Sequence, residues 1–329
     1  MSKNAQPLVS VVTPVLNGEG YLDECIQSVL TQQYQNWEYI IVNNCSTDRT
    51  LEIAETYAKK DTRIKIYNTD ELLPIMKNWN HALHQISPES KYCKVVHADD
   101  WLFPRCLDKM VEIAEAYPSV GLVGSYSLWG DKVVSDRLPF PSHFVRGPEL
   151  CRLTLLDIIY PFWSPTSLLI RSNVARRRTP FYNEVEAHLH ADVEACYETL
   201  RHSDFGFVHQ VLTFIRTHEA SMTSTAAEPF NAYILTNLDL LTQYGPIYLN
   251  PEEYRSHLGL RIKKYYRFLA HSLFQIRELG FWKYHRSTLK TMGYSLNIVK
   301  LVAVAVEELI RTPVTMLHFL FRSIAKCRK

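Results

Sequence analysis

The segment Val9–Thr50 reads VSVVTPVLNGEGYLDECIQSVLTQQYQNWEYIIVNNCSTDRT and is the most informative stretch about the fold. Its first residues belong to an apolar run rich in β-branched residues, Leu8–Val12, which is typical of a buried strand. After turn-forming residues at 17–20, Tyr21–Gln32 repeats apolar residues at helical spacing, and Trp37–Val42 is strand-like again. The order strand, helix, strand predicts one βαβ unit.

The same alternation continues as far as about residue 125. The further predicted strands are Ile64–Tyr67, Cys93–His97 and Val120–Ser125, and the predicted helices are Thr50–Lys59, Lys77–Ile86 and Pro104–Ala116. We therefore expect an α/β fold with a mostly parallel sheet flanked by helices. Ligands of such sheets bind beyond the carboxyl ends of the strands. The polar loops Thr13–Asn17, Asn43–Asp48 and Ala98–Trp101 should therefore meet at one edge.

The composition excludes several classes of protein. The chain has 329 residues, of which 47% are hydrophobic and 21% charged, as expected for a folded protein. Its seven cysteines form no CxxC pair and are odd in number, which argues against a zinc knuckle and a disulfide framework. The N-terminal apolar run is too short for a signal peptide, and no window reaches the ~20 apolar residues of a spanning helix. We expect a cytoplasmic protein with reduced cysteines.

The opening segment resembles the signature of glycosyltransferase family 2, the inverting enzymes with the GT-A fold. The matching residues are Pro14, Asn17, Ser28, Leu30, Gln32, Ser46, Asp48 and Thr50, and the resemblance extends over about residues 7–220. It implies a GT-A sheet and a nucleotide-diphosphate-sugar donor. It also implies that the donor is contacted by Pro14, Asn17, Asn44, Lys77 and Asp99.

A second motif, His97-Ala98-Asp99-Asp100, follows a predicted strand. Two carboxylates at a strand end can hold Mg²⁺ or Mn²⁺, which prefer oxygen ligands, and such an ion can neutralise a leaving diphosphate. The family pattern is often Asp-x-Asp-Asp, so His97 is a departure from it. By the resemblance, Asp99 is expected near the ribose and the metal, and Asp100 on the metal. The alternative is that the pair caps the helix beginning near Pro104.

The resemblance also implies a catalytic base. The family places an Asp or Glu at the start of a helix facing the donor sugar, where it takes the proton of the acceptor hydroxyl. Asp192 matches that position, although Ala191 stands where a second acid is common. Glu194 is the rival candidate, and the alternative for Asp192 is a helix N-cap.

Two further residues are candidates for the diphosphate end of the donor. His218 matches the histidine with which GT-A enzymes often end their core, so it is a candidate third metal ligand, or else a structural or surface histidine. Arg216 could bind phosphate oxygens in bidentate fashion or form a surface ion pair.

Recognition of the donor base departs from the usual pattern. Uridine-using relatives place acids at the end of the second strand, whereas this chain has Asn43-Asn44. An Asn carbonyl can accept the same hydrogen bond, so UDP- or dTDP-sugars remain favoured. Lys77 and Asn80 fall where relatives contact the base or diphosphate, with a solvated helix face as the alternative. Trp163 precedes a strand expected below the acceptor, where it could stack on a sugar or be a core residue.

The C-terminal part of the chain differs in charge from the rest. Residues 251–329 hold 15 Lys and Arg against 5 Asp and Glu, whereas the whole chain has a net charge of only +2. We expect a catalytic domain over 1–228 and a basic, amphipathic helical region over 229–329. Such helices can bind an anionic membrane surface, with a helical appendage on the core or a second subunit as the alternative. No nucleic-acid motif accompanies the basic residues.

The expected function is therefore inverting sugar transfer from a nucleotide donor to a saccharide or lipid-linked saccharide, in surface polysaccharide or glycolipid synthesis. The expected location is the inner face of the cytoplasmic membrane. Two alternatives stay open. One is an impaired binding or scaffold protein of the same fold, suggested by His97, Asn43-Asn44 and Ala191. The other is a nucleotidyltransferase, although Thr13–Gly20 lacks the Gly-rich basic loop of that class.

Overall fold

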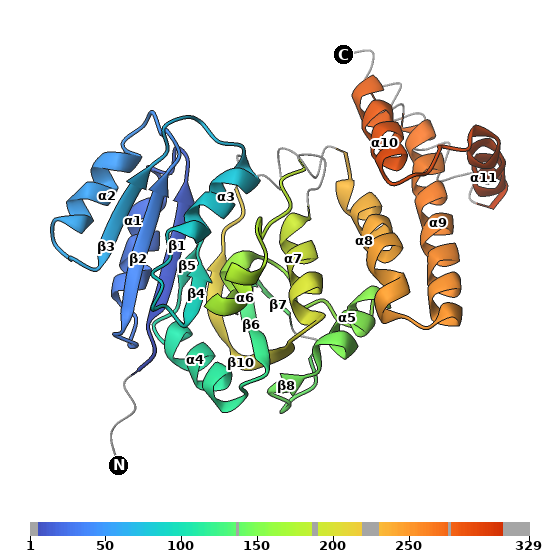
Figure 1. Ribbon diagram of the computed structural model, residues 1–329. Coiled ribbons are helices and arrows are strands. Elements are labelled where there is room, and N and C mark those ends of the chain that lie inside the picture. The colour runs from blue at the N-terminus through green and yellow to red at the C-terminus, as the bar shows by residue number, and fades with distance from the viewer. Residues whose placement is uncertain (1–5, 136–137, 186–189, 219–229, 276–277, 312–329) are drawn as a thin grey trace. The chain divides into compact units, whose positions relative to one another are not determined.

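The computed structural model describes residues 6–135, 138–185, 190–218, 230–275 and 278–311. The chain forms two compact units, Met1–Thr217 and His218–Lys329. The boundary predicted at residue 228 lies within 219–229, outside the described residues. Figure 1 labels the helices and strands of both units.

The first unit begins with the predicted βαβ units. Strands β1 (Val9–Val15), β2 (Trp37–Asn43), β3 (Ile64–Asn68) and β4 (Tyr92–Val95) pair in parallel in the order β3-β2-β1-β4. They are connected by helices α1 (Leu22–Leu30), α2 (Thr50–Ala58) and α3 (Ile75–His84). Every residue of β1 and β2 is buried, which explains their continuous apolar runs.

The sheet continues with strands that pair across long stretches of sequence. They are β9 (Leu168–Arg171), β6 (Val120–Trp129), β10 (Asp204–Ile215) and β5 (Trp101–Leu102), with β7 (Lys132–Val134) beside β6 and β8 (Phe144–Val145) beside β10. β9 runs antiparallel to both of its neighbours, β4 and β6, whereas β6 and β10 are parallel to each other. The predicted α/β fold with a large sheet flanked by helices is confirmed (Figure 1).

The remaining elements of this unit are helices α4 (Cys106–Ala116), α5 (Gly147–Leu155), α6 (Ser172–Arg177) and α7 (Ala191–Leu200), and a single 3₁₀ turn, Pro165–Ser167. The main core lies between the sheet and the apolar faces of α1 and α4, where Leu22, Ile26, Leu107 and Met110 are fully buried. This core fixes the direction of the strands and therefore where their carboxyl ends lie.

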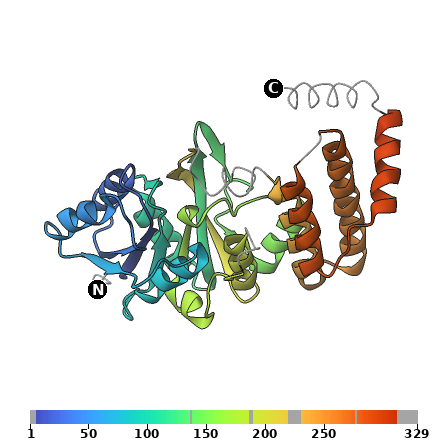
Figure 2. The same ribbon diagram turned by 90° about the horizontal axis from the view of Figure 1, so that it is seen from above.

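The second unit is helical. It contains α8 (Ala232–Tyr248), α9 (Pro251–Phe274), α10 (Leu279–Thr291) and α11 (Ile298–Arg311), seen as orange and red ribbons in Figure 2. The start of α9 is capped: the Asn250 side chain accepts from the backbone N–H of Glu252 and Glu253, and the Glu253 carboxylate accepts from the N–H of Asn250.

Within the residues that the structure describes, no helix is both long enough and apolar enough to cross a bilayer. Residues 312–329, which belong to the basic region predicted over 229–329, lie outside the described part of the chain.

Candidate active site

The loops after β1 and β2 are joined by hydrogen bonds between residues of the sequence signature. The Asn17 N–H donates to Ser46 Oγ at 3.0 Å, and Asn17 Oδ1 accepts from the Thr47 N–H at 2.8 Å. The Gly18 N–H donates to Thr50 Oγ1 at 2.7 Å. Asn17 has a positive φ of 51°, which Asn adopts more easily than most residues. Asn17 therefore fixes the shape of the loop at the rim of the site. The predicted contact of Asn17 with the donor stays a prediction. The predicted donor contact of Pro14, which is buried in β1, also stays a prediction.

Asn43 and Asn44 are both buried at the end of β2. Asn44 Oδ1 accepts hydrogen bonds from the N–H of Leu73 at 2.8 Å and from Thr69 Oγ1 at 3.2 Å, and its Nδ2 donates to Leu73 O at 2.9 Å. Asn43 Nδ2 donates to Asn68 Oδ1 at 2.8 Å. The pair therefore holds the chain after β3 in place. Its predicted contact with the donor base stays a prediction and would be made by atoms that already have protein partners.

The second motif lies directly after β4. The ligand atoms of His97, Asp99 and Asp100 all lie within 4.8 Å of one another. The alternative of helix capping is wrong, because the N-cap of α4 is Arg105 and no side chain caps that end. His97 was not among the candidate metal ligands predicted from the sequence, and the structure brings it beside the acid pair.

Asp100 is buried and is held from two sides. Its Oδ2 accepts from Thr166 Oγ1 at 2.6 Å, and its Oδ1 accepts from the Arg216 N–H at 3.0 Å. Burial, reinforced by the negative charge of Asp99, raises the pKa of Asp100 to about 8. Two carboxylates in so confined a place repel one another, and a divalent cation between them would remove that repulsion.

The imidazole of His97 lies against the ring of Trp79, with ring centroids 4.5 Å apart. Its Nε2 is buried and has no hydrogen-bond partner among the described residues. Burial lowers the pKa of His97, against the opposing effect of Asp99, which favours the neutral form of the ring. A neutral imidazole and two carboxylates are groups that bind Mn²⁺, so the residues present fit a divalent metal.

The 3₁₀ turn Pro165–Ser167 supports the His97–Asp100 cluster. This support was not predicted from the sequence. Thr166 Oγ1 accepts from the His97 N–H at 3.1 Å while it donates to Asp100. Below the turn, the fully buried Lys94 donates to Thr166 O at 2.6 Å and to Leu168 O at 3.1 Å. A lysine inside the apolar strand β4 was the available signal, since a buried ammonium group must find acceptors.

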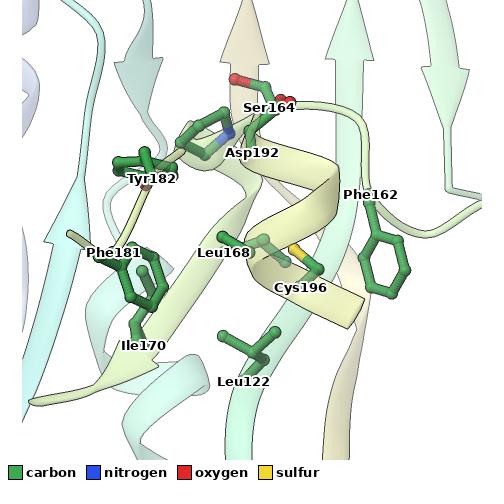
Figure 3. A pocket seen from close by; sticks show the side chains of 11 residues that line it. Leu122, Phe162, Ser164, Leu168, Ile170, Phe181, Tyr182, Asp192 and Cys196 are labelled. Atoms are coloured by element: carbon green, nitrogen blue, oxygen red, sulfur yellow. The ribbon is translucent and has the colours of Figure 1, made fainter. Parts of the chain in front are cut away.

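Asp192 is the second residue of α7 and lines a mostly apolar hollow. Figure 3 shows Asp192 beside Ser164 at one end of this hollow and Leu122 at the other. The N-cap of α7 is His190, so Asp192 is not the cap. The Asp192 Oδ1 accepts a local hydrogen bond from the Val193 N–H at 2.8 Å. Burial raises the pKa of Asp192. A carboxylate with a raised pKa is a better proton acceptor, as a general base requires.

Glu194, the rival to Asp192, has a structural role. Its Oε1 accepts from Arg178 Nη2 at 2.7 Å and its Oε2 from Asn183 Nδ2 at 3.0 Å, and the side chain is buried. These bonds tie α7 to the chain just before it. Glu194 therefore positions the helix that carries Asp192.

Helix α3 is tied to the same region through Asn80. Its Nδ2 donates to Tyr182 O at 2.8 Å, and its Oδ1 accepts from the Tyr182 N–H at 2.8 Å. The buried Asn80 amide is thus turned toward the protein backbone, whereas Lys77 on the same helix is exposed. A contact between Lys77 and the donor stays a prediction.

Three other candidates have distinct positions. Arg216 forms an ion pair with Glu24, which was one of the two roles predicted for it, the other being phosphate binding. The Arg216 Nε also donates to Asp99 O at 3.0 Å. His218 begins the second unit and is outside the His97–Asp100 cluster, so its role as a ligand stays a prediction. Trp163 is 37% exposed, which excludes a fully buried core position.

The sequence of this site matches a known family. Residues 10–178, just over half of the chain, match the family model described as glycosyl transferase family 2. This chain belongs to glycosyltransferase family 2. The match includes the two motif loops and the His97–Asp100 cluster and ends before Asp192.

Curated proteins with related sequences are also named as glycosyltransferases. The putative glycosyltransferase EpsE of Bacillus subtilis is 32% identical over 160 residues, which are 46% of this chain and 57% of EpsE. The putative teichuronic acid biosynthesis glycosyltransferase TuaG of the same species is 33% identical over 146 residues, or 44% of this chain and 55% of TuaG. The family 2 chain thus spans little more than half the length of these relatives.

Solved structures confirm the GT-A fold of this family 2 chain. Staphylococcus aureus TarS 1–349, in complex with UDP-GlcNAc, has a TM-score of 0.66 and 16% identity, covering 96% of this chain and 88% of that one. The mannosyltransferase PcManGT from Pyrobaculum calidifontis, in complex with GDP-Man and Mn²⁺, has a TM-score of 0.53 and 16% identity, covering 98% and 87%. Identities this low support the fold alone.

Proposed function

We propose that this chain is an inverting glycosyltransferase that moves a sugar from a nucleotide-diphosphate donor to an acceptor hydroxyl in surface polysaccharide or glycolipid synthesis. The observation that carries the proposal is the segment Ser164–Ser167, which belongs to both halves of the site. The Thr166 hydroxyl donates a hydrogen bond to Asp100, one of the two acids of the candidate cation site. Ser164 lines the hollow that Asp192 also lines. One short turn therefore connects a candidate cation site with a candidate base.

The donor is proposed to be a UDP- or dTDP-sugar. The choice of a uridine donor is motivated by the TarS structures, which share the fold and contain UDP and UDP-GlcNAc. The name of TuaG, which refers to teichuronic acid biosynthesis, motivates the polysaccharide context and does not identify a donor. Asn17, Asn44 and Lys77 lie on the loops and the helix after β1, β2 and β3, at the edge where ligands of α/β sheets bind.

The cation is proposed to be Mn²⁺ or Mg²⁺ held by Asp99 and Asp100, with His218 as a further candidate ligand. When bound, such an ion supplies positive charge that stabilises a departing nucleoside diphosphate. Hydrogen bonds from Thr166 and from the Arg216 N–H keep the Asp100 carboxylate in one orientation. Binding of an ion therefore needs little reorientation of this ligand.

Asp192 is proposed as the base that accepts the proton of the acceptor hydroxyl during a single displacement. Its raised pKa favours proton transfer near neutral pH. Because the base acts on the face of the sugar opposite the leaving group, the configuration at the anomeric carbon inverts and no covalent enzyme intermediate forms.

We propose that this enzyme acts at the inner face of the cytoplasmic membrane. The outer face of α11 carries exposed aliphatic side chains, among them Val299 at 81% exposure and Ile310 at 75%, together with Val302 and Val306. Residues 251–329 have a large excess of basic side chains. Apolar residues beside cations favour binding to anionic lipid, at about 1 kcal/mol per cation near the surface.

The first experiment is a thermal-shift screen of nucleotide sugars with and without Mn²⁺. A donor that binds the folded state raises the melting temperature by mass action, and the rise should depend on Mn²⁺. A donor that binds but is neither transferred nor hydrolysed by any sample would support the alternative of a scaffold protein.

The second experiment replaces the base. Asp192→Asn should reduce turnover by about 10²–10⁴-fold, the usual contribution of general base catalysis, while the donor-induced thermal shift is unchanged. Glu198→Gln also converts a carboxylate to an amide, six residues further along α7. It is the matched control and should leave turnover intact. Normal turnover of Asp192→Asn would remove Asp192 from this role.

A further inference from the structure

His97 occupies the first position of the cation motif, where the family pattern often has Asp. We propose that His97 binds the divalent cation through an imidazole nitrogen, beside the oxygen ligands of the acid pair, so that the centre prefers Mn²⁺ to Mg²⁺. This inference rests on the proposed function, because it assumes that the acid pair holds a cation. It adds a ligand that the family pattern does not supply.

The position of the ring is compatible with shared ligation. Nδ1 of His97 lies 3.8 Å from Oδ2 of Asp100, and the ligand atoms of His97, Asp99 and Asp100 lie within 4.8 Å of one another. Two atoms bound to one octahedral ion at about 2.1 Å are about 3 to 4.2 Å apart. Small side-chain rotations therefore bring all three residues within reach of a single ion.

Among the described residues, the imidazole nitrogens have no hydrogen-bond partner. Nε2 is buried without a hydrogen bond, and the 3.8 Å separation of Nδ1 from Asp100 is too long for one, within the part of the chain that the structure describes. Neither ring nitrogen is therefore engaged by a described protein group that an ion would have to displace.

The ring is also held in place before any ion arrives. One side of the ring is packed against Trp79. The backbone N–H of His97 donates to Thr166 Oγ1, the same hydroxyl that orients Asp100, which fixes the backbone from which the ring projects. A ligand fixed in this way loses little conformational entropy on binding.

The replacement of Asp by His changes which ions the site favours. Mg²⁺ strongly prefers oxygen ligands, whereas imidazole nitrogen suits transition metals better. The neutral ring also removes one negative charge compared with the Asp-x-Asp-Asp pattern, which weakens the electrostatic attraction of any divalent ion. The preference for Mn²⁺ therefore arises from the nitrogen rather than from charge.

The test is pulsed electron paramagnetic resonance on the full chain with Mn²⁺ and UDP, using unlabelled protein and protein with ¹⁵N-labelled histidine. We expect a ¹⁴N coupling to Mn²⁺ that changes to ¹⁵N on labelling and disappears in His97→Asp. That variant should also lower the ratio of Mg²⁺ to Mn²⁺ dissociation constants by about tenfold or more, as for loss of other groups that support metal sites. His84→Asp, the same change at an exposed residue of α3, is the matched control and should behave as wild type.

Two results would overturn the inference. If Mn²⁺ binds and requires Asp99, but shows no histidine coupling and an unchanged metal preference in His97→Asp, then His97 is not a ligand while the proposed function stands. If wild-type protein binds no Mn²⁺ with or without UDP, the inference fails together with the metal part of the proposed function.

Discussion

The hydroxyl of Thr166 is the contact on which the arrangement of the cation cluster most depends. In Thr166→Val a methyl group replaces the hydroxyl at nearly constant volume, so no cavity forms in this fully buried position. Two hydrogen bonds are lost, the 2.6 Å bond donated to Asp100 and the 3.1 Å bond accepted from the His97 N–H.

The expected cost follows from these two bonds. A hydrogen bond to a charged group contributes about 1.5–3 kcal/mol, and a neutral one about 1 kcal/mol; the lower figure applies where Asp100 is protonated. A buried backbone N–H left without an acceptor costs about 1–3 kcal/mol. We expect Thr166→Val to lower the free energy of unfolding by roughly 2–4 kcal/mol, a large share of the 5–15 kcal/mol typical of a domain. Thr166→Ser keeps the hydroxyl and loses one methyl group, which costs about 1 kcal/mol.

The assay is urea unfolding followed by tryptophan fluorescence, because five of the six tryptophans lie in the first unit. A Mn²⁺ titration of the same variants should show about tenfold weaker binding in Thr166→Val, because Asp100 loses its orientation, and near-normal binding in Thr166→Ser. The reasoning is refuted if the two variants have the same unfolding free energy within about 0.5 kcal/mol and the same affinity for Mn²⁺.

Three other predictions test separate parts of the molecule. Because the folded-state pKa of Asp100, about 8, lies above that of the unfolded chain, metal-free protein should lose stability as pH rises from 5 to 8. Mn²⁺ competes with the bound proton, so it should raise the melting temperature more at pH 8 than at pH 6, and an equal rise at both would contradict the assignment. Glu194→Gln should cost about 1–3 kcal/mol of stability while turnover of the folded enzyme persists, because its partners are Arg178 and Asn183; loss of turnover would make Glu194 the base. Val302→Asp on α11 should weaken co-sedimentation with phosphatidylglycerol vesicles by about tenfold, whereas Ser287→Asp, an equal charge change on α10, should not. Equal binding by both variants would exclude this face of α11 as the membrane contact.

The first half of the fold was predictable because its pattern is local. β1 and β2 are buried on both faces, so their sequences must be continuously apolar, and the helices between them repeat apolar residues at helical spacing. The acids that follow β4 were predictable for the same reason, since a polar pair directly after a buried strand lies at the sheet edge.

The supports of the site were not predictable in this way. The Thr166 hydroxyl meets Asp100, and Lys94 meets the Thr166 carbonyl, because β9 inserts antiparallel between β4 and β6. No periodic pattern in the sequence predicts that pairing. The protein partners of Asn44 and Asn80 were not predictable either, because each side chain is engaged by backbone groups far away in the sequence.

The sequence by itself therefore determined the resemblance to the family, the alternation of strands and helices as far as about residue 125, and the acids Asp99, Asp100 and Asp192 as candidates. Only the tertiary structure decided what surrounds these acids: a threonine hydroxyl and an imidazole beside Asp100, and an apolar hollow around Asp192. The physical reason is that strand and helix patterns depend on neighbouring residues. The pKa and the ligands of a carboxylate depend instead on whatever the folded chain brings within a few ångströms of it.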